Sequence, residues 1–249
     1  MGKLEGRVAV ITGGTKGIGE QAVRMMAREG AKVLYMGLED APQIADELNA
    51  EGCDVTFFKG ADMMNKSDIE AFTKAALDKY GKVDVLFLHA GLGLQGKIEE
   101  MPMDEWYWYM DLNLNHNMYT IRQVLPSMMK NNYGSIIFTS SIAGLVGRPG
   151  GPNMPAYCAS KAAQSGLARS IACDYGKYNI RCNVVCPGII DTDVYHFLEG
   201  PPDFFNGEIP MGRPGRPEEV ASLVTFLAGN EATYITGTTI PVDGGCVIC

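Results

Sequence analysis

The sequence predicts an α/β protein, in which one doubly wound domain holds a mostly parallel, seven-stranded sheet with helices on both faces. Short apolar runs alternate with longer amphipathic stretches from one end of the chain to the other. The apolar runs are rich in Val, Ile and Phe and lack strict alternation, as expected of strands buried on both faces. The first run ends in a glycine-rich turn, TGGTKGIG, that leads into an amphipathic stretch.

The predicted elements follow one another in a βα order along the whole chain. Strands are predicted at seven apolar runs bounded by turn residues, at 7–12, 32–36, 54–58, 83–89, 135–140, 180–186 and 238–242. Helices are predicted at the amphipathic stretches between them, at about 17–29, 41–51, 67–80, 104–131, 156–178 and 217–229. Linkers and repeats do not interrupt this order, so residues 1–249 are predicted to form a single domain.

Composition and charge narrow the class of protein. Apolar residues make up 46% and charged residues 20% of the 249 residues, which is ordinary for a globular protein. The net charge of -8 and the lack of Lys/Arg runs argue against nucleic acid or acidic membrane as a partner. The N-terminus lacks the pattern of a signal peptide, and apolar segments stay shorter than a bilayer needs, so a cytoplasmic protein is expected. Seven scattered cysteines, ending in CVIC, predict neither a disulfide framework nor a metal site.

The glycine-rich turn at 12–19 predicts a bound dinucleotide. Glycine loses more conformational freedom on folding than any other residue, so this cluster needs a reason. Ligands of doubly wound sheets bind at the carboxyl ends of the strands, where this turn lies. Gly13, Gly17 and Gly19 let the backbone approach a pyrophosphate, and the following helix offers amide donors at its N-terminus. The alternative is a tight connection between strand and helix without a ligand.

A second motif, YCASK, predicts a proton donor. Tyr157 and Lys161 are four residues apart, so on a helix they share one face. A phenol has a pKa near 10, and a nearby ammonium group favours the phenolate and lowers that pKa. The alternative is a helix surface that carries one aromatic residue and one lysine.

With both motifs present, the chain resembles the short-chain dehydrogenase/reductase family, in its branch of single Rossmann-type domains, along nearly its whole length. Further matches come in family order: GADM at 60–63, HAG at 89–91, DLNLN around Asn113, TSSIAG around Ser141 and CPGIIDTD at 186–193. MGRPGRPEEVA and VDGG resemble the usual C-terminal part. His89 stands where the family usually has asparagine, and we expect it to bond neighbouring backbone as the asparagine does.

The resemblance implies hydride transfer between a nicotinamide and the carbon of a secondary alcohol or its ketone. Tyr157 would be the general acid or base, and Ser141, preferred over the adjacent Ser140, would hold the reacting oxygen. Lys161 would stabilise the tyrosinate and bind the nicotinamide ribose. Asn113 would hold a water that links Lys161 to solvent.

The resemblance also implies a set of cofactor contacts spread over the carboxyl ends of the strands. Besides Tyr157 and Lys161, these are Gly13, Thr15, Lys16, Gly17, Ile18, Gly19, Gly37, Leu38, Glu39, Asp62, Met63, His89, Ala90, Gly91, Pro187, Gly188, Ile189 and Thr192.

The choice between NAD and NADP is expected to depend on the end of the second strand. Gly37 stands at the usual aspartate position, and Leu38 stands where NADP enzymes often have arginine. Glu39 and Asp40 add negative charge that would repel a 2′-phosphate, which favours NAD. Lys16 in the glycine-rich turn could reach such a phosphate, so NADP remains the alternative.

The expected substrate is a small-molecule alcohol or ketone, bulky and hydrophobic, such as a hydroxysteroid. This expectation rests on aromatic residues in a predicted lid at about 194–210, which could instead fold the lid onto the body. The interval from Ser141 to Tyr157 is longer than usual in the family, and residues 148–155 carry the extra length. The alternatives are an NADPH-dependent 3-oxoacyl carrier or CoA reductase and a nucleotide-binding regulator without turnover. The resemblance further implies a homotetramer or a homodimer.

Overall fold

The computed structural model describes residues 2–93, 96–147, 154–193 and 209–248, and it has the predicted α/β architecture. One seven-stranded sheet has the order β3-β2-β1-β4-β5-β6-β7, and all its neighbouring strands are parallel. The strands are β1 (Val8–Thr12), β2 (Lys32–Met36), β3 (Asp54–Phe57), β4 (Val85–Leu88), β5 (Gly134–Thr139), β6 (Ile180–Pro187) and β7 (Thr239–Val242). Each predicted strand is therefore confirmed, with small shifts at its ends.

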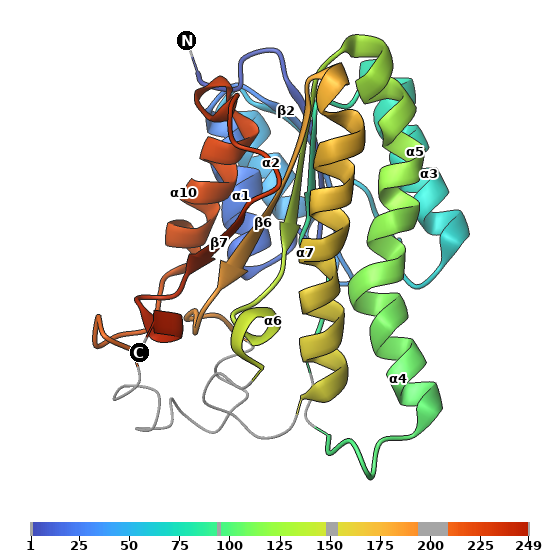
Figure 1. The fold of residues 1–249 in the computed structure, drawn as a ribbon. Coiled ribbons are helices and arrows are strands. Elements are labelled where there is room, and N and C mark those ends of the chain that lie inside the picture. The colour runs from blue at the N-terminus through green and yellow to red at the C-terminus, as the bar shows by residue number, and fades with distance from the viewer. Residues whose placement is uncertain (1, 94–95, 148–153, 194–208, 249) are drawn as a thin grey trace.

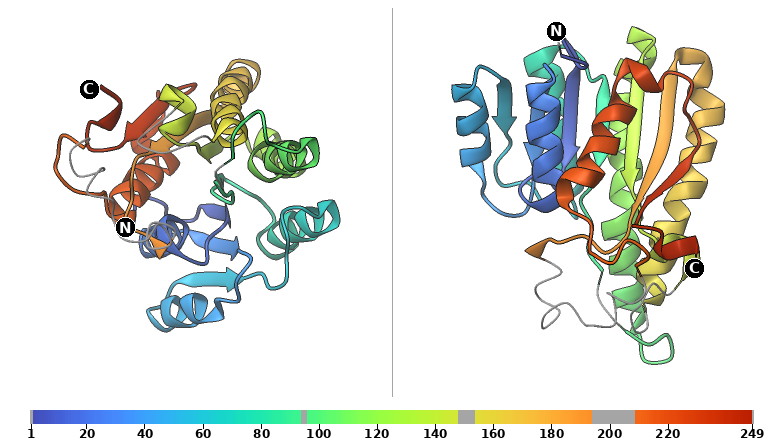
Figure 2. Two further views of the ribbon diagram at one scale, coloured as in Figure 1. Left: turned by 90° about the horizontal axis from the view of Figure 1, so that it is seen from below. Right: turned by 90° about the vertical axis from the view of Figure 1, so that its left-hand side faces the viewer.

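Helices cover both faces of the sheet (Figure 1). One face carries α1 (Gly17–Arg28), α2 (Pro42–Ala50) and α10 (Pro217–Ala228). The other carries α3 (Lys66–Tyr80), α4 (Met103–Met110), α5 (His116–Asn131) and α7 (Pro155–Tyr175). A short helix, α6 (Ala143–Val146), follows β5. The view from below in Figure 2 shows the sheet between these two layers. Among the described helices, none has the length and apolar character needed to cross a membrane.

Two apolar cores fill the space between the sheet and its helical layers. Successive residues of β1 divide between them: Ile11 packs in the core on the side of α1, α2 and α10, and Val10 in the core on the side of α3, α5 and α7. This division explains why the strands lack polar alternation, since each face of the sheet is covered.

The predicted helix at 104–131 is interrupted by a π-helical turn at Asp111–Asn115, between α4 and α5. A π-turn widens the helix by one residue and releases backbone groups from the regular hydrogen-bond ladder, often at a functional site. The sequence prediction missed this interruption and also missed α6.

A buried carboxylate fixes the start of the two central strands. The side chain of Asp84, just before β4, is 2% exposed and accepts a hydrogen bond from the backbone N–H of Val8 at 2.9 Å. Its oxygens also lie 2.7 Å from Lys82 Nζ and 3.7 Å from an Arg7 guanidinium nitrogen. The carboxylate therefore ties the first residue of β1 to the start of β4 and pairs with two cations.

We expect Asp84→Ala to lower the free energy of unfolding by about 3 kcal/mol, because it leaves a buried N–H unpaired and two cations without their anion. Urea unfolding followed by circular dichroism measures the change. As a control, Asp78→Ala removes an exposed carboxylate paired with Lys74 on α3 and should change the free energy by less than about 0.5 kcal/mol. Equal losses in the two variants would contradict this role of Asp84.

Candidate active site

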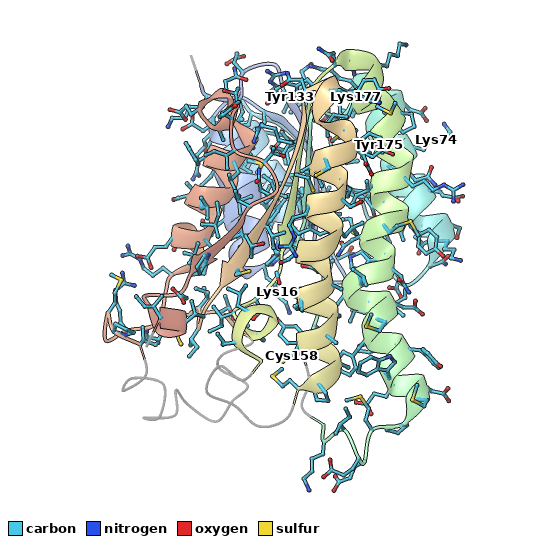
Figure 3. The ribbon with its side chains drawn as sticks, in the orientation of Figure 1. Lys16, Lys74, Tyr133, Cys158, Tyr175 and Lys177 are labelled. Atoms are coloured by element: carbon cyan, nitrogen blue, oxygen red, sulfur yellow. The ribbon has the colours of Figure 1, made fainter. Side chains whose placement is uncertain are left out.

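The predicted site residues meet at one edge of the sheet. Most of them lie at the ends of β1, β2, β3, β4, β5 and β6 or at the start of α7, and parallel strands bring these carboxyl ends together. Asn113 joins them from the π-turn. The order β2-β1-β4-β5 makes the β1/β4 pair the point where chain connections run in opposite directions, which is where doubly wound sheets bind ligands. In Figure 3 the carboxyl ends of the strands point downward. Lys16 and Cys158 lie toward this end of the sheet, and Tyr133 and Lys177 lie at the opposite end.

The glycine-rich turn after β1 leaves little room for side chains at its glycines. Gly13 and Gly17 have φ angles of +69° and +54°, a region that favours glycine. A Cβ atom at Gly19 would lie 1.9 Å from the carbonyl oxygen of Gly13 and 2.9 Å from the His89 ring. This packing places the N-terminus of α1 directly above the turn, so a pyrophosphate fits here against backbone amides.

Two other residues of this turn, Ile18 and Thr15, have side chains that pack against the rest of the protein. Ile18 is buried in the core on the α1 side. Thr15 packs against Gly37, where a Cβ atom would lie 2.2 Å from the Thr15 hydroxyl oxygen. The small size of Gly37 therefore has a structural reason.

The segment after β2 carries charges that are paired with one another. Lys16 Nζ lies 2.6 Å from Glu39 Oε1, and Asp40 pairs with Lys59. Leu38, which precedes Glu39, is 86% exposed, so it does not fill a pocket in the described structure. The cation that could bind a phosphate is thus already bonded to a carboxylate.

After β3, Asp62 and Met63 differ in exposure. The Asp62 carboxylate is exposed and accepts a hydrogen bond from the Met64 N–H at 2.8 Å, which fixes the turn. Met63 is buried in the core on the α3 side, so only its backbone can face a cofactor.

His89 lies at the end of β4, behind the glycine-rich turn. Its backbone N–H donates to the Thr12 hydroxyl at 3.1 Å, and its Nδ1 lies 3.1 Å from the Thr139 hydroxyl. Ala90, which comes next, also donates its N–H to Thr12, at 3.2 Å. Burial, assisted by the charge of Lys161, lowers the pKa of His89 to about 3. His89 is therefore neutral at physiological pH and joins β4 to β1 and β5. Its ring meets the Thr139 hydroxyl rather than neighbouring backbone, which differs from the expectation.

Ser141, Tyr157 and Lys161 lie together. The Tyr157 phenol lies beside the Ser141 side chain, which opposes the rise of the Tyr157 pKa. Lys161 Nζ lies 5.6 Å from the centroid of the Tyr157 ring and donates to the carbonyl of Thr139 at 2.8 Å. The neighbouring Ser140 hydroxyl donates instead to the carbonyl of Lys161 at 2.8 Å. Of the two serines, Ser141 faces the tyrosine.

Burial changes both titrating groups of this cluster. It raises the pKa of the Tyr157 phenol, against an opposing effect of the Ser141 hydrogen bond. It also lowers the pKa of Lys161 to about 8. The expected lowering of the Tyr157 pKa by Lys161 is therefore not found, because loss of water raises this pKa and Lys161 is not among the groups that shift it. Lys161 exchanges protons close to neutral pH.

The π-turn directs Asn113 to the loop after β4. Its amide group forms two hydrogen bonds of 3.0 Å with the backbone N–H and carbonyl of Leu92. Its backbone carbonyl accepts from Asn117 Nδ2 at 2.9 Å and from Gln164 Nε2 at 2.7 Å. The water predicted at Asn113 would therefore have to share either its amide group or its backbone carbonyl with these partners. Sequence reasoning missed Asn117 and Gln164, although they follow Asn113 and Lys161 by one helical turn.

The segment after β6 closes the site from the other side. Pro187 ends β6, and Gly188 and Ile189 follow it, with a Cβ atom at Gly188 lying 2.7 Å from Asp243. The methyl carbon of Thr192 lies 3.2 Å from the Cβ position of Gly17, so the two loops touch above the start of α1. Most of the predicted lid, 194–208, and residues 148–153 of the longer loop lie outside the described residues.

Comparisons with known sequences identify the kind of site. A family model described as enoyl-(acyl carrier protein) reductase matches residues 13–247. The 3-oxoacyl-[acyl-carrier-protein] reductase FabG of Thermotoga maritima is 34% identical, over 99% of this chain and 100% of that protein. The trans-4-hydroxycyclohexanecarboxylate dehydrogenase of Sinomonas cyclohexanicum is 36% identical, over 96% of this chain and 92% of that protein.

Solved structures agree with these relatives. The structure of gox2181 matches with a TM-score of 0.94 and 33% identity, over 99% of this chain and 98% of that one. A structure from Beutenbergia cavernae with bound NADP at low occupancy matches with a TM-score of 0.91 and 30% identity, over 99% and 98% of the two chains. At these identities the likeness covers the sequence as well as the fold.

We expect the buried histidines to make stability depend on pH. Burial lowers the pKa of His89 to about 3 and that of His116 to about 4, whereas both titrate near 6.5 when unfolded. Below pH 6.5 the unfolded chain therefore binds more protons than the folded protein. The free energy of unfolding decreases as the pH is lowered through this range. Between pH 7.5 and 5, each histidine should remove about 2 kcal/mol.

Urea unfolding at the two pH values tests this expectation. His89→Asn or His116→Leu should each remove about half of the loss, because each variant lacks one of the two groups. An undiminished loss in both variants would show that other groups cause the pH dependence.

Proposed function

The chain belongs to the short-chain dehydrogenase/reductase family, a family of nicotinamide-dependent oxidoreductases, and we propose that it interconverts a secondary alcohol and its ketone. The close approach of the Ser141 and Tyr157 side chains, with Lys161 one helical turn away, is the observation that carries this proposal. The glycine-rich turn lies at the same edge of the sheet, so a dinucleotide bound there reaches the three side chains. The nicotinamide, when bound, supplies or accepts the hydride.

The protein groups place the reacting oxygen and move its proton. In reduction, the Ser141 hydroxyl donates a hydrogen bond to the carbonyl oxygen, and Tyr157 gives its phenolic proton to that oxygen as negative charge develops. In oxidation, the Tyr157 phenolate takes the proton from the alcohol. Because burial raises the pKa of the phenol, the neutral acid prevails before reaction, which suits reduction.

Lys161 supports Tyr157 in two ways. Its ammonium group stabilises the phenolate that proton donation leaves, and its donors not used on the Thr139 carbonyl are free to bind the ribose of the cofactor. Asn113 acts on the same region by holding the backbone of Leu92 beside the site. We therefore assign Tyr157 to proton transfer and Asn113 to positioning.

NAD is the proposed cofactor. Lys16 is the cation placed to meet a 2′-phosphate, and it is paired with Glu39. Both side chains are about half exposed, so this pair stabilises the fold by less than about 1 kcal/mol. A phosphate at Lys16 would nevertheless face the Glu39 carboxylate, whereas NAD carries no such phosphate. NADP stays the alternative, because the Beutenbergia cavernae structure holds it.

The proposed substrate is a bulky, hydrophobic secondary alcohol or ketone. Leu92, Leu145 and Val146 support this choice, because they follow closely after Gly91 and Ser141 and remain partly exposed. The hydroxysteroid class predicted from the lid aromatics is one member of this group. The relative from Sinomonas cyclohexanicum is named for a cyclic alcohol, which is consistent with it.

Reduction of a 3-oxoacyl chain on a carrier protein is the second candidate, because the family description and the relative from Thermotoga maritima both name acyl carrier protein. An acidic carrier requires a basic docking surface. In the segment before α4 and in its first turn, Lys97 is paired with Glu100, and Glu99, Asp104 and Glu105 add negative charge. These charges favour a free small molecule over a carrier-bound one. A regulator without turnover is disfavoured by the assembled Ser141, Tyr157 and Lys161.

We retain a homotetramer or homodimer as the proposed assembly, in the cytoplasm. The assembly is supported by large apolar side chains that α4 and the start of α5 expose, namely Met103, Tyr107, Trp108 and Met118. Tyr109 from the same run is buried, so the aromatic run serves helix packing and also leaves an apolar surface.

We expect Tyr157→Phe to lower kcat by about 10²–10⁴-fold, because it removes the acid and base while keeping the ring. Cofactor affinity, measured by nicotinamide fluorescence, should stay within about threefold, since the glycine-rich turn is unchanged. Tyr175→Phe, at the other end of α7, is the matched control and should retain full activity (Figure 3). A fully active Tyr157→Phe enzyme would refute the assignment.

We expect Glu39→Gln to tighten NADPH binding by about fivefold, because it removes the charge that opposes the 2′-phosphate and frees Lys16. NADH affinity should stay within about twofold. Parallel fluorescence titrations measure both, and Glu70→Gln on α3 controls for the change in net charge. Tighter binding of NADPH than of NADH by the unmodified protein would contradict the proposed preference.

A further inference from the structure

The ring of His89 is held in one orientation by contacts on three sides. It stacks on the Phe87 ring, with 5.4 Å between the ring centroids and 22° between the planes. Its Nδ1 edge faces β5, where the Thr139 hydroxyl oxygen lies 3.1 Å from Nδ1. Its Cδ2 edge faces the glycine-rich turn, because a Cβ atom at Gly19 would lie 2.9 Å from Cδ2. The positions of both ring nitrogens are therefore fixed.

The second ring nitrogen, Nε2, has no partner in the described part of the protein. It is bonded to Cδ2, so it lies at the tip of the ring on the side of the glycine-rich turn. Hydrogen bonds between described residues do not reach it, and it is not one of the buried atoms that lack a partner. His89 as a whole is partly exposed. Nε2 is therefore the accessible end of a ring that is otherwise packed.

Nε2 opens toward the place where the glycine-rich turn fits a pyrophosphate. A Cβ atom at Gly13 would lie 2.9 Å from the backbone nitrogen of Ala90 and 3.3 Å from the carbonyl carbon of His89, so the turn rests on this part of the chain. Gly19, in the first turn of α1, lies against the His89 ring. A phosphate bound at the N-terminus of α1 is therefore on the Nε2 side of the ring.

The turn itself offers few side-chain donors for this phosphate. Ile18 is apolar and buried, Thr15 packs against the glycine after β2, and Lys16 is bonded to Glu39 at 2.6 Å. Backbone amides at the start of α1 supply the remaining donors. Nε2 of His89 is a further nitrogen at this place that is not engaged elsewhere.

The bond to Thr139 lets the ring present a donor at Nε2. A neutral imidazole carries its proton on one nitrogen and accepts a hydrogen bond at the other. Since a hydroxyl can either donate or accept, the Thr139 hydroxyl can donate to Nδ1 and leave the proton on Nε2. A phosphate oxygen only accepts, so it favours this tautomer. The low pKa of His89, about 3, keeps the ring neutral while it donates.

The position of His89 selects one of the two phosphates of a dinucleotide. The ring lies between the glycine-rich turn and Thr139, whose carbonyl holds Lys161 Nζ at 2.8 Å. Lys161 is the group proposed to bind the nicotinamide ribose. The phosphate nearer the nicotinamide is therefore the one that comes closest to Nε2.

We propose that His89 binds the cofactor directly, by a hydrogen bond from Nε2 to an oxygen of the phosphate nearer the nicotinamide. This contact depends on the proposed nicotinamide cofactor and adds a side-chain ligand to it. Asparagine, the usual residue of the family at this position, has a shorter side chain that can meet Thr139 but does not reach the tip of the ring.

Two variants separate the roles of the two nitrogens. The amide of asparagine replaces a group near Nδ1, whereas the amide nitrogen of glutamine comes near the position of Nε2. We expect His89→Asn to weaken NADH binding about tenfold, as expected for a lost hydrogen bond to a charged group, and His89→Gln to weaken it by less than about threefold. Nicotinamide fluorescence measures both affinities, and thermal melting shows that both variants are folded. Equal affinities of His89→Asn and the unmodified protein, or weaker binding by His89→Gln than by His89→Asn, would overturn the proposal.

Fragments of the cofactor locate the contact. ADP carries both phosphates, whereas AMP lacks the one nearer the nicotinamide. His89→Asn should weaken ADP binding about as much as NADH binding and should change AMP binding by less than about twofold, as measured by calorimetry. A loss seen with NADH and absent with ADP would place the contact at the nicotinamide ribose and overturn the proposal.

Nitrogen-15 NMR of the imidazole groups tests the same bond without variants of affinity. The chain has three histidines, and the signals of His89 are those that His89→Gln lacks. In the NADH complex Nε2 should carry the proton and Nδ1 should not, and the Nε2 signal should shift on binding. A proton on Nδ1 in the complex would overturn the proposal. Failure of the proposed function would appear differently, as NADH that is bound through His89 and transfers no hydride. Lack of NADH binding by the unmodified protein would refute both.

Discussion

The parallel pairing of β1 with β4 is the constraint on which the rest of the structure depends. Asp84 fixes the start of this pair, and Thr12 and His89 join its end. Since all seven strands run in one direction, every loop that carries a site residue emerges at the same edge. The glycine-rich turn then brings its own backbone close to the ends of β1 and β4, and the π-turn brings Asn113 to the loop after β4.

Burial governs the chemistry of this edge as much as charge does. Lys161 and His89 have lost water, and the pKa of each is lowered by it, to about 8 and about 3. One group therefore exchanges protons near neutrality, and the other remains a neutral hydrogen-bonding group. The Tyr157 phenol, held by Ser141, remains an acid because burial raises its pKa.

The sequence predicted the elements whose signals are local. Apolar runs marked all seven strands, and the spacing of Tyr157 and Lys161 placed both on one face of α7. The π-turn escaped prediction because it depends on hydrogen bonds between Asn113 and residues distant in the chain. The burial of His116, Asn117 and Gln164 escaped for a related reason. Polar residues on a helix are usually read as exposed, whereas here α7 packs against the π-turn, and Gln164 and Asn117 bond the Asn113 carbonyl. The pairing of Lys16 with Glu39 likewise needed the three-dimensional arrangement of two loops.

The central claim is hydride transfer to or from the carbon whose oxygen is held by Ser141 and Tyr157. The most direct measurement supplies the protein with NADH or NADPH that carries deuterium at the transferable position, together with cyclic ketones and 3-oxoacyl thioesters, and analyses the products by mass spectrometry. The account predicts one deuterium on the carbinol carbon of a ketone substrate. Binding of the cofactor without deuterium in any product and without oxidation of the cofactor would contradict it.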